Sequence, residues 1–104
     1  MGFNCIRLPF TVEQALNDPT VPLHSALPNA VLAANPDFLM LSSLEVFDKT
    51  VEALTDAGLM IILNVHTSAS EWCCDLKSYE GLWFTPEWTL SQFETALVEV
   101  REEW

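Results

Sequence analysis

Two polar side chains stand near the ends of two apolar stretches that have the character of buried strands. Arg7 belongs to residues 3–8, and His66 directly follows residues 59–65. Because side chains alternate along a strand, one face carries Phe3, Cys5 and Arg7 in the first stretch and Met60, Ile62, Asn64 and His66 in the second. Barrel enzymes build their active sites where parallel strands end. A lone arginine or histidine is more often structural, but two at matching strand ends favour a functional interpretation.

The segment 67–88 supplies further candidates for chemistry. It holds Gly, Pro, Ser and aromatic residues without steady periodicity, which predicts a long surface loop of a kind that is usually functional. The spacing of its carboxylates, Glu71, Asp75 and Glu80, presets no facing pair, and we expect them to be solvated. Its aromatic rings suit stacking on sugar C–H groups and equally suit packing of the loop onto a barrel rim. These rings belong to Trp72, Trp83, Phe84 and Trp88.

The histidine and the cysteines do not predict a metal site. His66, Cys73 and Cys74 are zinc-ligand types, but adjacent cysteines chelate poorly and no fourth ligand is evident. We expect no metal and no other cofactor, and the sequence has neither a G-x-S-x-G elbow nor a Gly-rich phosphate loop. Together with Cys5 the cysteines number three, so one thiol is free or pairs outside this chain. The redox compartment stays open.

The charge balance excludes whole classes of partner. Fifteen acidic residues stand against four basic ones, for a net charge of −11. Nucleic-acid binding depends on neutralising phosphates, so we expect no nucleic-acid partner, and an anionic membrane surface is disfavoured in the same way. A neutral sugar carries no such penalty. The longest apolar run, at 58–63, is far shorter than the roughly 20 residues of a membrane span.

The elements that position the candidates follow from caps and periodicity. We predict a strand over about residues 3–8, ended by Pro9, which cannot donate to a ladder. After a long connection, Ser42 and Glu45 form a capping box for a helix over about 43–57, and Gly58 supplies its stop.

The second half of the chain repeats the pattern. A nearly all-apolar strand is predicted over about 59–65, and apolar character on both faces implies a parallel strand covered by helices. After the loop, a helix is predicted over about 90–104, with Ser91 and Glu94 as a second capping box.

The order of these elements defines an α/β class. Strand, connection, helix, strand, loop and helix make a parallel β-α-β-α segment. Two strands are too few for an independent sheet, and both ends of the chain look cut. We therefore interpret residues 1–104 as one fragment of a larger domain, whose remaining strands would be its partners.

At this point the residues resemble a family. "GFNCIRLPF", "LEVFDKTVEALTDAGLMIILNVHTS" and "EWCCDLKSYEGLWFTPEW" resemble the second and third β/α units of glycoside hydrolase family 5, the cellulase-like barrel hydrolases. The likeness covers essentially the whole chain. Its most specific parts are the R-L-P and N-x-H strand ends joined through a helix and an A-G-L turn, and the Trp-Cys-Cys loop is a weaker cue. The resemblance implies a partial (β/α)₈ TIM barrel.

The resemblance also implies roles for particular residues. Arg7 matches the arginine that holds the family's nucleophilic glutamate, and His66 matches the histidine that lines the sugar subsite at the reacting bond. Asn64, Trp72 and Trp83 are the expected substrate-binding residues. The family's acid/base glutamate follows an asparagine at the end of the fourth strand and its nucleophile ends the seventh, and neither strand is within residues 1–104.

The implied activity is that of a retaining glycosidase. Such an enzyme would cleave β-glycosidic bonds of glucan-like polysaccharides or related glycosides with water and no metal, and enzymes of this kind are mostly extracellular. The alternative is a non-catalytic remnant that at most binds carbohydrate or a protein partner. A following strand that ends in Asn-Glu would favour the enzyme, and a stop codon with no barrel partner would favour the remnant.

We predict that the isolated 104-residue chain shows no measurable hydrolysis of β-glucans or aryl β-glycosides, because neither catalytic glutamate is present. The measurement is a reducing-sugar or chromogenic assay of the purified chain. Its control is the triple variant Glu71→Gln, Asp75→Asn, Glu80→Gln. Turnover that survives in the triple variant would have no mechanism in this account, and turnover abolished by one of the substitutions would identify a local acid.

Overall fold

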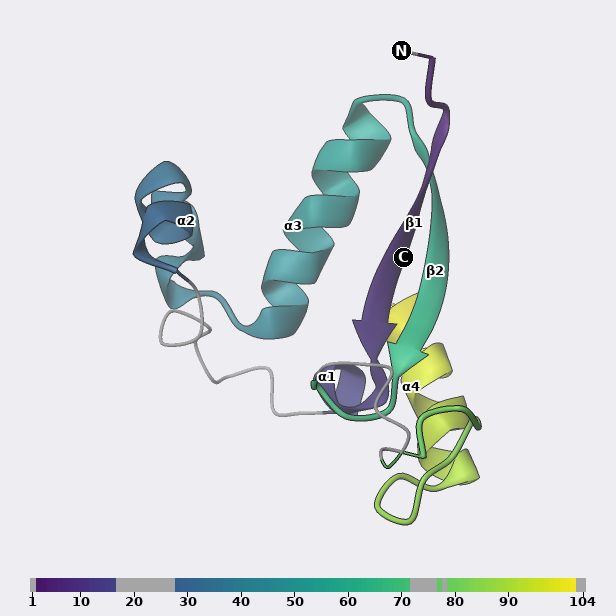
Figure 1. The fold of residues 1–104 in the computed structure, drawn as a ribbon. Coiled ribbons are helices and arrows are strands. Elements are labelled where there is room, and N and C mark those ends of the chain that lie inside the picture. The colour runs from purple at the N-terminus through teal and green to yellow at the C-terminus, as the bar shows by residue number, and fades with distance from the viewer. Residues whose placement is uncertain (1, 17–27, 72–76, 78, 103–104) are drawn as a thin grey trace. The chain divides into compact units, whose positions relative to one another are not determined.

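The fold is an α/β arrangement that is described in a computed structural model for residues 2–16, 28–71, 77 and 79–102. Its elements are, in order, β1 (Cys5–Thr11), α1 (Val12–Leu16), α2 (Asn29–Ala34), the 3₁₀ helix η2 (Pro36–Met40), α3 (Ser43–Asp56), β2 (Met60–Thr67) and α4 (Leu90–Glu102), as Figure 1 shows. The chain divides into two compact units, Met1–Asn17 with Leu59–Trp104, and Asp18–Gly58. None of the helices that the structure describes is long and apolar enough to cross a membrane.

The two strands pair in parallel, as the sequence predicts. The register runs from Cys5 opposite Met60 to Phe10 opposite Val65. In Figure 1 the two arrows lie side by side with their heads at the same end. The carboxyl ends of both strands therefore meet at one edge, from which α1 and the loop after β2 depart.

The prediction that Pro9 ends the first strand is wrong, because β1 continues through it to Thr11. The backbone N–H of Met60 donates to the carbonyl oxygen of Asn4 at 3.0 Å. Hydrogen-bonding groups alternate between the two edges of a strand, so the even-numbered residues of β1 face β2. The nitrogen of Pro9 then points to the other edge, where the missing N–H breaks no bond with β2.

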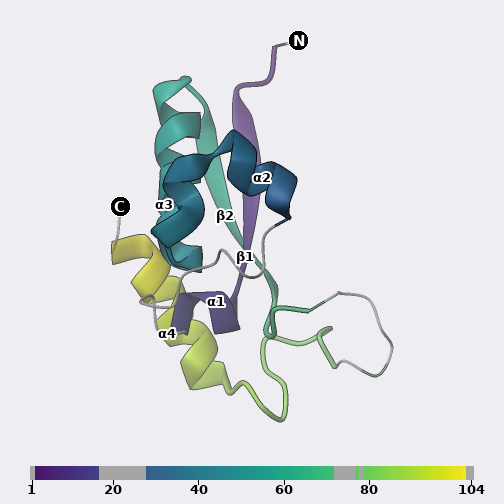
Figure 2. The ribbon, with the colours of Figure 1, turned by 90° about the vertical axis from the view of Figure 1, so that its left-hand side faces the viewer.

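The core of the first unit lies where α1 meets α4. The two helices lie side by side (Figure 2). Their buried side chains are small or β-branched, and Phe10 at the end of β1 is buried as well; the helical members are Val12, Ala15, Ala96 and Val100. The first turn of α1 is held by Thr11, whose Oγ1 accepts the N–H of Gln14 at 2.9 Å.

Helix α4 starts from a different cap than the one predicted. The N–H of Thr89 donates to Oε1 of Gln92 at 2.8 Å, and the N–H of Gln92 donates to Oγ1 of Thr89 at 3.3 Å. This is a reciprocal capping box with glutamine at the third helical position. The predicted box at Ser91 and Glu94 is wrong because both residues already lie inside the helix.

Helix α3 in the second unit begins at Ser43, as predicted, and ends at Asp56, one residue before the predicted end. The N–H of Glu45 donates to Oγ of Ser42 at 3.2 Å, and the N–H of Ser42 donates to Oε2 of Glu45 at 2.7 Å, which confirms the capping box. Such a cap is worth about 1 kcal/mol. Gly58 follows the helix with φ +79°, a left-handed conformation that glycine adopts without steric cost, so the predicted stop is confirmed as well.

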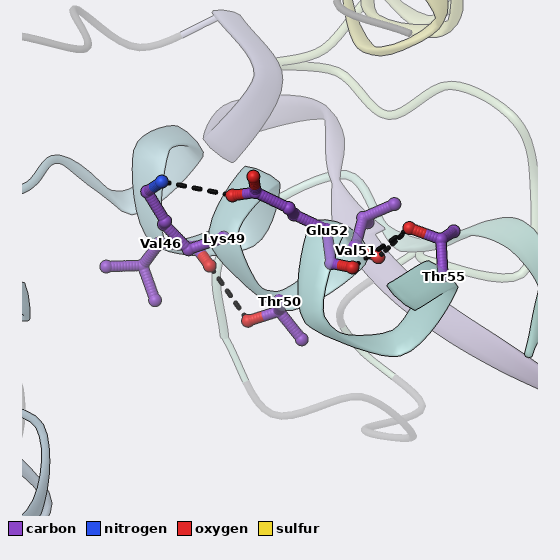
Figure 3. Close-up of polar contacts among 6 residues, drawn as sticks. All are labelled: Val46, Lys49, Thr50, Val51, Glu52 and Thr55. Atoms are coloured by element: carbon purple, nitrogen blue, oxygen red, sulfur yellow. Dashed lines mark hydrogen bonds and ion pairs between the residues drawn. The ribbon is translucent and has the colours of Figure 1, made fainter. Parts of the chain in front are cut away.

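Polar side chains along α3 bond to backbone carbonyl groups or to another side chain of the same helix (Figure 3). Thr50 Oγ1 donates to the carbonyl oxygen of Val46 at 2.8 Å, and Thr55 Oγ1 donates to that of Val51 at 2.9 Å. Lys49 Nζ lies 3.0 Å from Glu52 Oε2.

The Lys49–Glu52 pair contributes little to stability. The hydrogen bond from Lys49 to Glu52 raises the pKa of Lys49 above its ordinary value of 10.5. A raised lysine pKa means that the pair is intact at neutral pH and is lost only as the pH rises through that pKa. Both partners are exposed, and exposed pairs of this kind stabilise a helix only weakly.

One face of the strand pair is exposed although it carries large apolar side chains. Met60 is 63% exposed and Ile62 is 53% exposed, and Phe3, which precedes β1, is 74% exposed. The opposite face is more buried, with half-buried Ile6 and Ile61. Exposed apolar surface on a sheet face favours association with other chains.

We predict that the isolated chain binds a hydrophobic dye and aggregates or stays molten, because its strand pair exposes apolar side chains. Dye fluorescence and thermal melting followed by circular dichroism measure this. The double variant Met60→Thr, Ile62→Thr should lower dye binding more than the control Met40→Thr, whose side chain is 74% exposed in the other unit. A sharp cooperative melt of a monomer with little dye binding would contradict the prediction.

Candidate functional site

The strand register puts Arg7 and Asn64 on one face of the pair. Arg7 lies opposite Ile62, and Pro9 lies opposite Asn64. Directly paired residues of neighbouring strands point to the same face, and residues two apart on one strand do so too. Arg7, Ile62 and Asn64 therefore share the exposed face, with the Arg7 side chain itself exposed.

His66 occupies a bulge at the end of β2. Phe10 pairs with Val65 and Thr11 pairs with Thr67, so His66 is the extra residue with no partner on β1. A bulge of this kind bends the strand and redirects a side chain. The ring lies on the side of Asn64, because Asn64 Nδ2 and His66 Nδ1 are 3.5 Å apart. When the amide donates to Nδ1, the ring proton resides on Nε2, which remains available as a donor.

Arg7 and His66 share a face but not a level along the strands. The sequence places both at corresponding strand ends, and the register corrects this: Arg7 is level with Ile62 and His66 lies four residues further along β2. At about 3.3 Å per residue the two backbone positions are roughly 13 Å apart along the strands. The difference arises because β1 continues past Arg7 to Thr11.

His66 and Trp83 line one hollow of about 170 Å³ beside the end of β2. Glu80 and Phe93 line the same hollow. Both predicted candidates are exposed, Trp83 at 72%. An imidazole donor beside an accessible indole face provides one hydrogen bond and one stacking surface, which are the contacts that a pyranose ring can use.

The turn that follows His66 is held by a carboxylate from the loop. Glu80 Oε2 accepts the N–H of Ser68 at 2.6 Å, and Glu80 Oε1 accepts the N–H of Ala69 at 3.1 Å. Thr67 Oγ1 donates to the carbonyl oxygen of Ala69 at 2.7 Å and closes the turn. The prediction that Glu80 is merely solvated is therefore wrong.

A second carboxylate holds the same turn from α1. The N–H of Ser70 donates to Glu13 Oε2 at 2.6 Å, and the N–H of Glu13 donates to the carbonyl oxygen of Ser68 at 2.9 Å. Thr11 Oγ1 and Ser70 Oγ are 2.9 Å apart. The end of β1 and the turn after β2 are thus joined by side-chain and backbone bonds.

Sequence reasoning missed the role of Glu13 and misread that of Glu80. Glu80 stands twelve residues beyond Ser68, and no spacing rule connects a loop carboxylate to backbone N–H groups at that separation. Glu13 sits in the first turn of α1, where an acidic residue is unremarkable because it favours the helix dipole.

The remaining predicted residues lie outside the described part of the chain or away from His66. Trp72, Cys73, Cys74 and Asp75 lie outside the described residues. Glu71 is exposed and Trp88 is half-buried, and both line a second hollow of about 300 Å³; Phe84 is exposed elsewhere on the loop.

Cys5 is a half-buried free thiol. Among the described residues, no three His, Cys, Asp or Glu side chains gather to hold a metal ion.

The parallel strands and the polar side chains near their carboxyl ends define an α/β protein with a candidate site at that edge. The profile of the family described as Cellulase (glycosyl hydrolase family 5) matches residues 1–99. The chain belongs to glycosyl hydrolase family 5, which confirms the resemblance that its strand-end motifs indicate.

Two curated relatives support this membership. A glycosyl hydrolase 5 family protein of Chamaecyparis obtusa is 33% identical over 91 residues, covering 78% of this chain and 16% of the relative. The major extracellular endoglucanase of Xanthomonas campestris pv. campestris is 29% identical over 93 residues, covering 89% of this chain and 17% of the relative. The chain thus spans less than a fifth of the length of the curated relatives it matches. No solved structure gives a significant match.

Proposed function

We propose that residues 1–104 are the second and third β/α units of a (β/α)₈ barrel in a retaining glycosidase that cleaves β-glycosidic bonds of glucan-like substrates. One observation carries the proposal: in a chain of family 5, Arg7, Asn64 and His66 lie on one exposed face of two parallel strands. Barrel enzymes use this carboxyl-terminal edge for catalysis. The parallel pair, its exposed apolar face and its polar edge fit an interior that further strands would complete.

In this proposal Arg7 positions a catalytic carboxylate from outside the described chain. An exposed guanidinium offers two parallel N–H donors to a carboxylate, which fixes its orientation and keeps it ionised. Retaining hydrolysis requires an ionised nucleophile about 5–5.5 Å from a protonated acid. The distance of roughly 13 Å between the backbones of Arg7 and His66 leaves room for a carboxylate and a sugar between their side chains.

His66, Asn64 and Trp83 contact the sugar in this proposal. Asn64 orients the imidazole so that Nε2 donates to a sugar hydroxyl, and Trp83 provides a stacking surface in the same hollow. Trp72 is proposed as a further stacking residue by family resemblance. The enzyme needs no metal in this mechanism, because the two carboxyl groups carry the acid, base and nucleophile roles.

The relatives suggest a location and a substrate class. The Xanthomonas campestris relative is named as an extracellular endoglucanase. We propose an extracellular site of action on a carbohydrate polymer, with nucleic acid excluded as a partner by the net charge of −11. The gene sequence beyond Trp104 tests the barrel directly: a strand ending in Asn-Glu supports the enzyme, whereas an immediate stop codon supports the non-catalytic remnant.

We predict that Arg7→Met in the complete gene product lowers kcat on a soluble β-glucan by about 100-fold, because the charge-assisted bond to the nucleophile is lost. Steady-state kinetics measure this effect. Arg101→Gln is the matched control, since it removes an exposed positive charge from the last turn of α4. Equal kcat values in the parent and in Arg7→Met would refute the proposed role of Arg7.

A further inference from the structure

We propose that Glu80 is a positioning residue that sets the orientation of His66 through the turn at 67–70. The inference rests on the proposed function, because it assigns His66 to the sugar site. It assigns a role at the site to a residue that lies outside the strand-end motifs. Glu80 does this from the loop, whereas Glu13 binds the same turn from α1.

The contacts of the turn carry the first step. Three successive N–H groups, those of Ser68, Ala69 and Ser70, all donate to carboxylate oxygens, the first two to Glu80 and the third to Glu13. Hydrogen bonds to ionised acceptors are shorter and stronger than neutral ones. Two of the three are 2.6 Å long. Each backbone N–H at residues 68–70 is therefore held by a carboxylate.

Burial makes the bond from Ser68 to Glu80 costly to lose. Thr67 and Ser68 are each only 4% exposed, although both are polar. A buried N–H that loses its acceptor has no water to replace it, so the backbone must move to find another partner. Thr67 pairs with Thr11 of β1 and is joined directly to His66, which has no pairing partner on β1, so a movement of the turn is passed along the chain to His66.

The backbone before Glu80 suits this task. Tyr79 has φ +57°, a left-handed conformation that is uncommon for a bulky residue. Strained residues of this kind persist where surrounding contacts hold them, and they occur preferentially at functional sites. Here the residue that follows the strained one accepts two N–H bonds from the turn and lines the hollow shared by His66 and Trp83.

The decisive variant is Glu80→Gln in the complete gene product. Glutamine keeps the size of the side chain but replaces one acceptor oxygen with an NH₂ group, which faces an N–H donor of the turn. Glu94→Gln is the matched control, because it removes an exposed carboxylate from α4 in the same unit. The readouts are hydrogen exchange of the Ser68 and Ala69 amides, the NMR signals of the His66 ring, and kcat and KM on a soluble β-glucan.

We expect Glu80→Gln to speed exchange of one or both amides by at least about 10-fold, to shift the His66 ring signals, and to lower kcat by about 10-fold with KM within about 2-fold. A displaced group that acts on the reacting sugar lowers kcat more than KM. Glu94→Gln should change none of these quantities. Glu80→Asp keeps the charge but is one methylene shorter, so it should fall short of the parent in each readout.

The outcomes separate this inference from the proposed function. Unchanged amide exchange, or faster exchange with unmoved His66 ring signals, would overturn the positioning role. Faster exchange with kcat and KM both unchanged in an active parent would overturn it as well. A parent with no activity on any β-glycoside would refute the proposed function, and the His66 ring signals alone would then decide whether Glu80 positions this side chain.

Discussion

The parallel pairing of β1 with β2 is the constraint on which the site depends. A strand has only two faces, so a register fixed by backbone hydrogen bonds decides at once which side chains can act together. The bond from the Met60 N–H to the Asn4 carbonyl oxygen sets that register. It puts Arg7 and Asn64 on the exposed face, and it turns the nitrogen of Pro9 away from β2 so that β1 can continue to Thr11. The extra length of β1 then separates Arg7 from His66 along the strands.

The second organising influence is the need to satisfy backbone groups where the ladder ends. Beyond the pair of Thr11 with Thr67 the strand ladder ends, and side-chain carboxylates accept the N–H groups of the next three residues. Glu80 and Glu13 come from opposite directions in the sequence and bind consecutive N–H groups. Buried polar backbone without such partners would be costly, so this local chemistry stabilises a specific turn geometry next to the candidate site.

The exposed apolar face and the family membership agree with each other. Met60 and Ile62 are exposed in residues 1–104, and the chain matches less than a fifth of its relatives in glycosyl hydrolase family 5. Large apolar side chains on the same face as Arg7 and Asn64 suit the packed interior of a barrel, where layers of side chains from several strands fill the space. In the proposed function, the polar residues near the strand ends mark the edge at which such an interior opens to a ligand.

Features that depend on residues close together in the sequence were predicted correctly in several places. The capping box of Ser42 and Glu45, the stop at Gly58 and the parallel apolar strands depend on residue types within a few positions of one another, and each was confirmed. The strand-end motifs around Arg7 and His66 likewise indicated the family. The predicted cap of α4 at Ser91 with Glu94 is wrong because Thr89 with Gln92, a pair that satisfies the same rule, forms the capping box instead.

The tertiary structure decided what depends on distant partners. Pro9 inside a strand is acceptable only because of the edge it faces, and the bulge at His66 exists only relative to β1. The two carboxylates at the turn could not be inferred from spacing, since Glu13 and Ser70 are 57 residues apart and Glu80 binds N–H groups more than ten residues away. Sequence by itself therefore determined the presence of the two strands and of helices α3 and α4, and the family of this chain. Long-range hydrogen bonds decided the position of each site residue along the strands and the groups that hold it. No local pattern encodes such bonds.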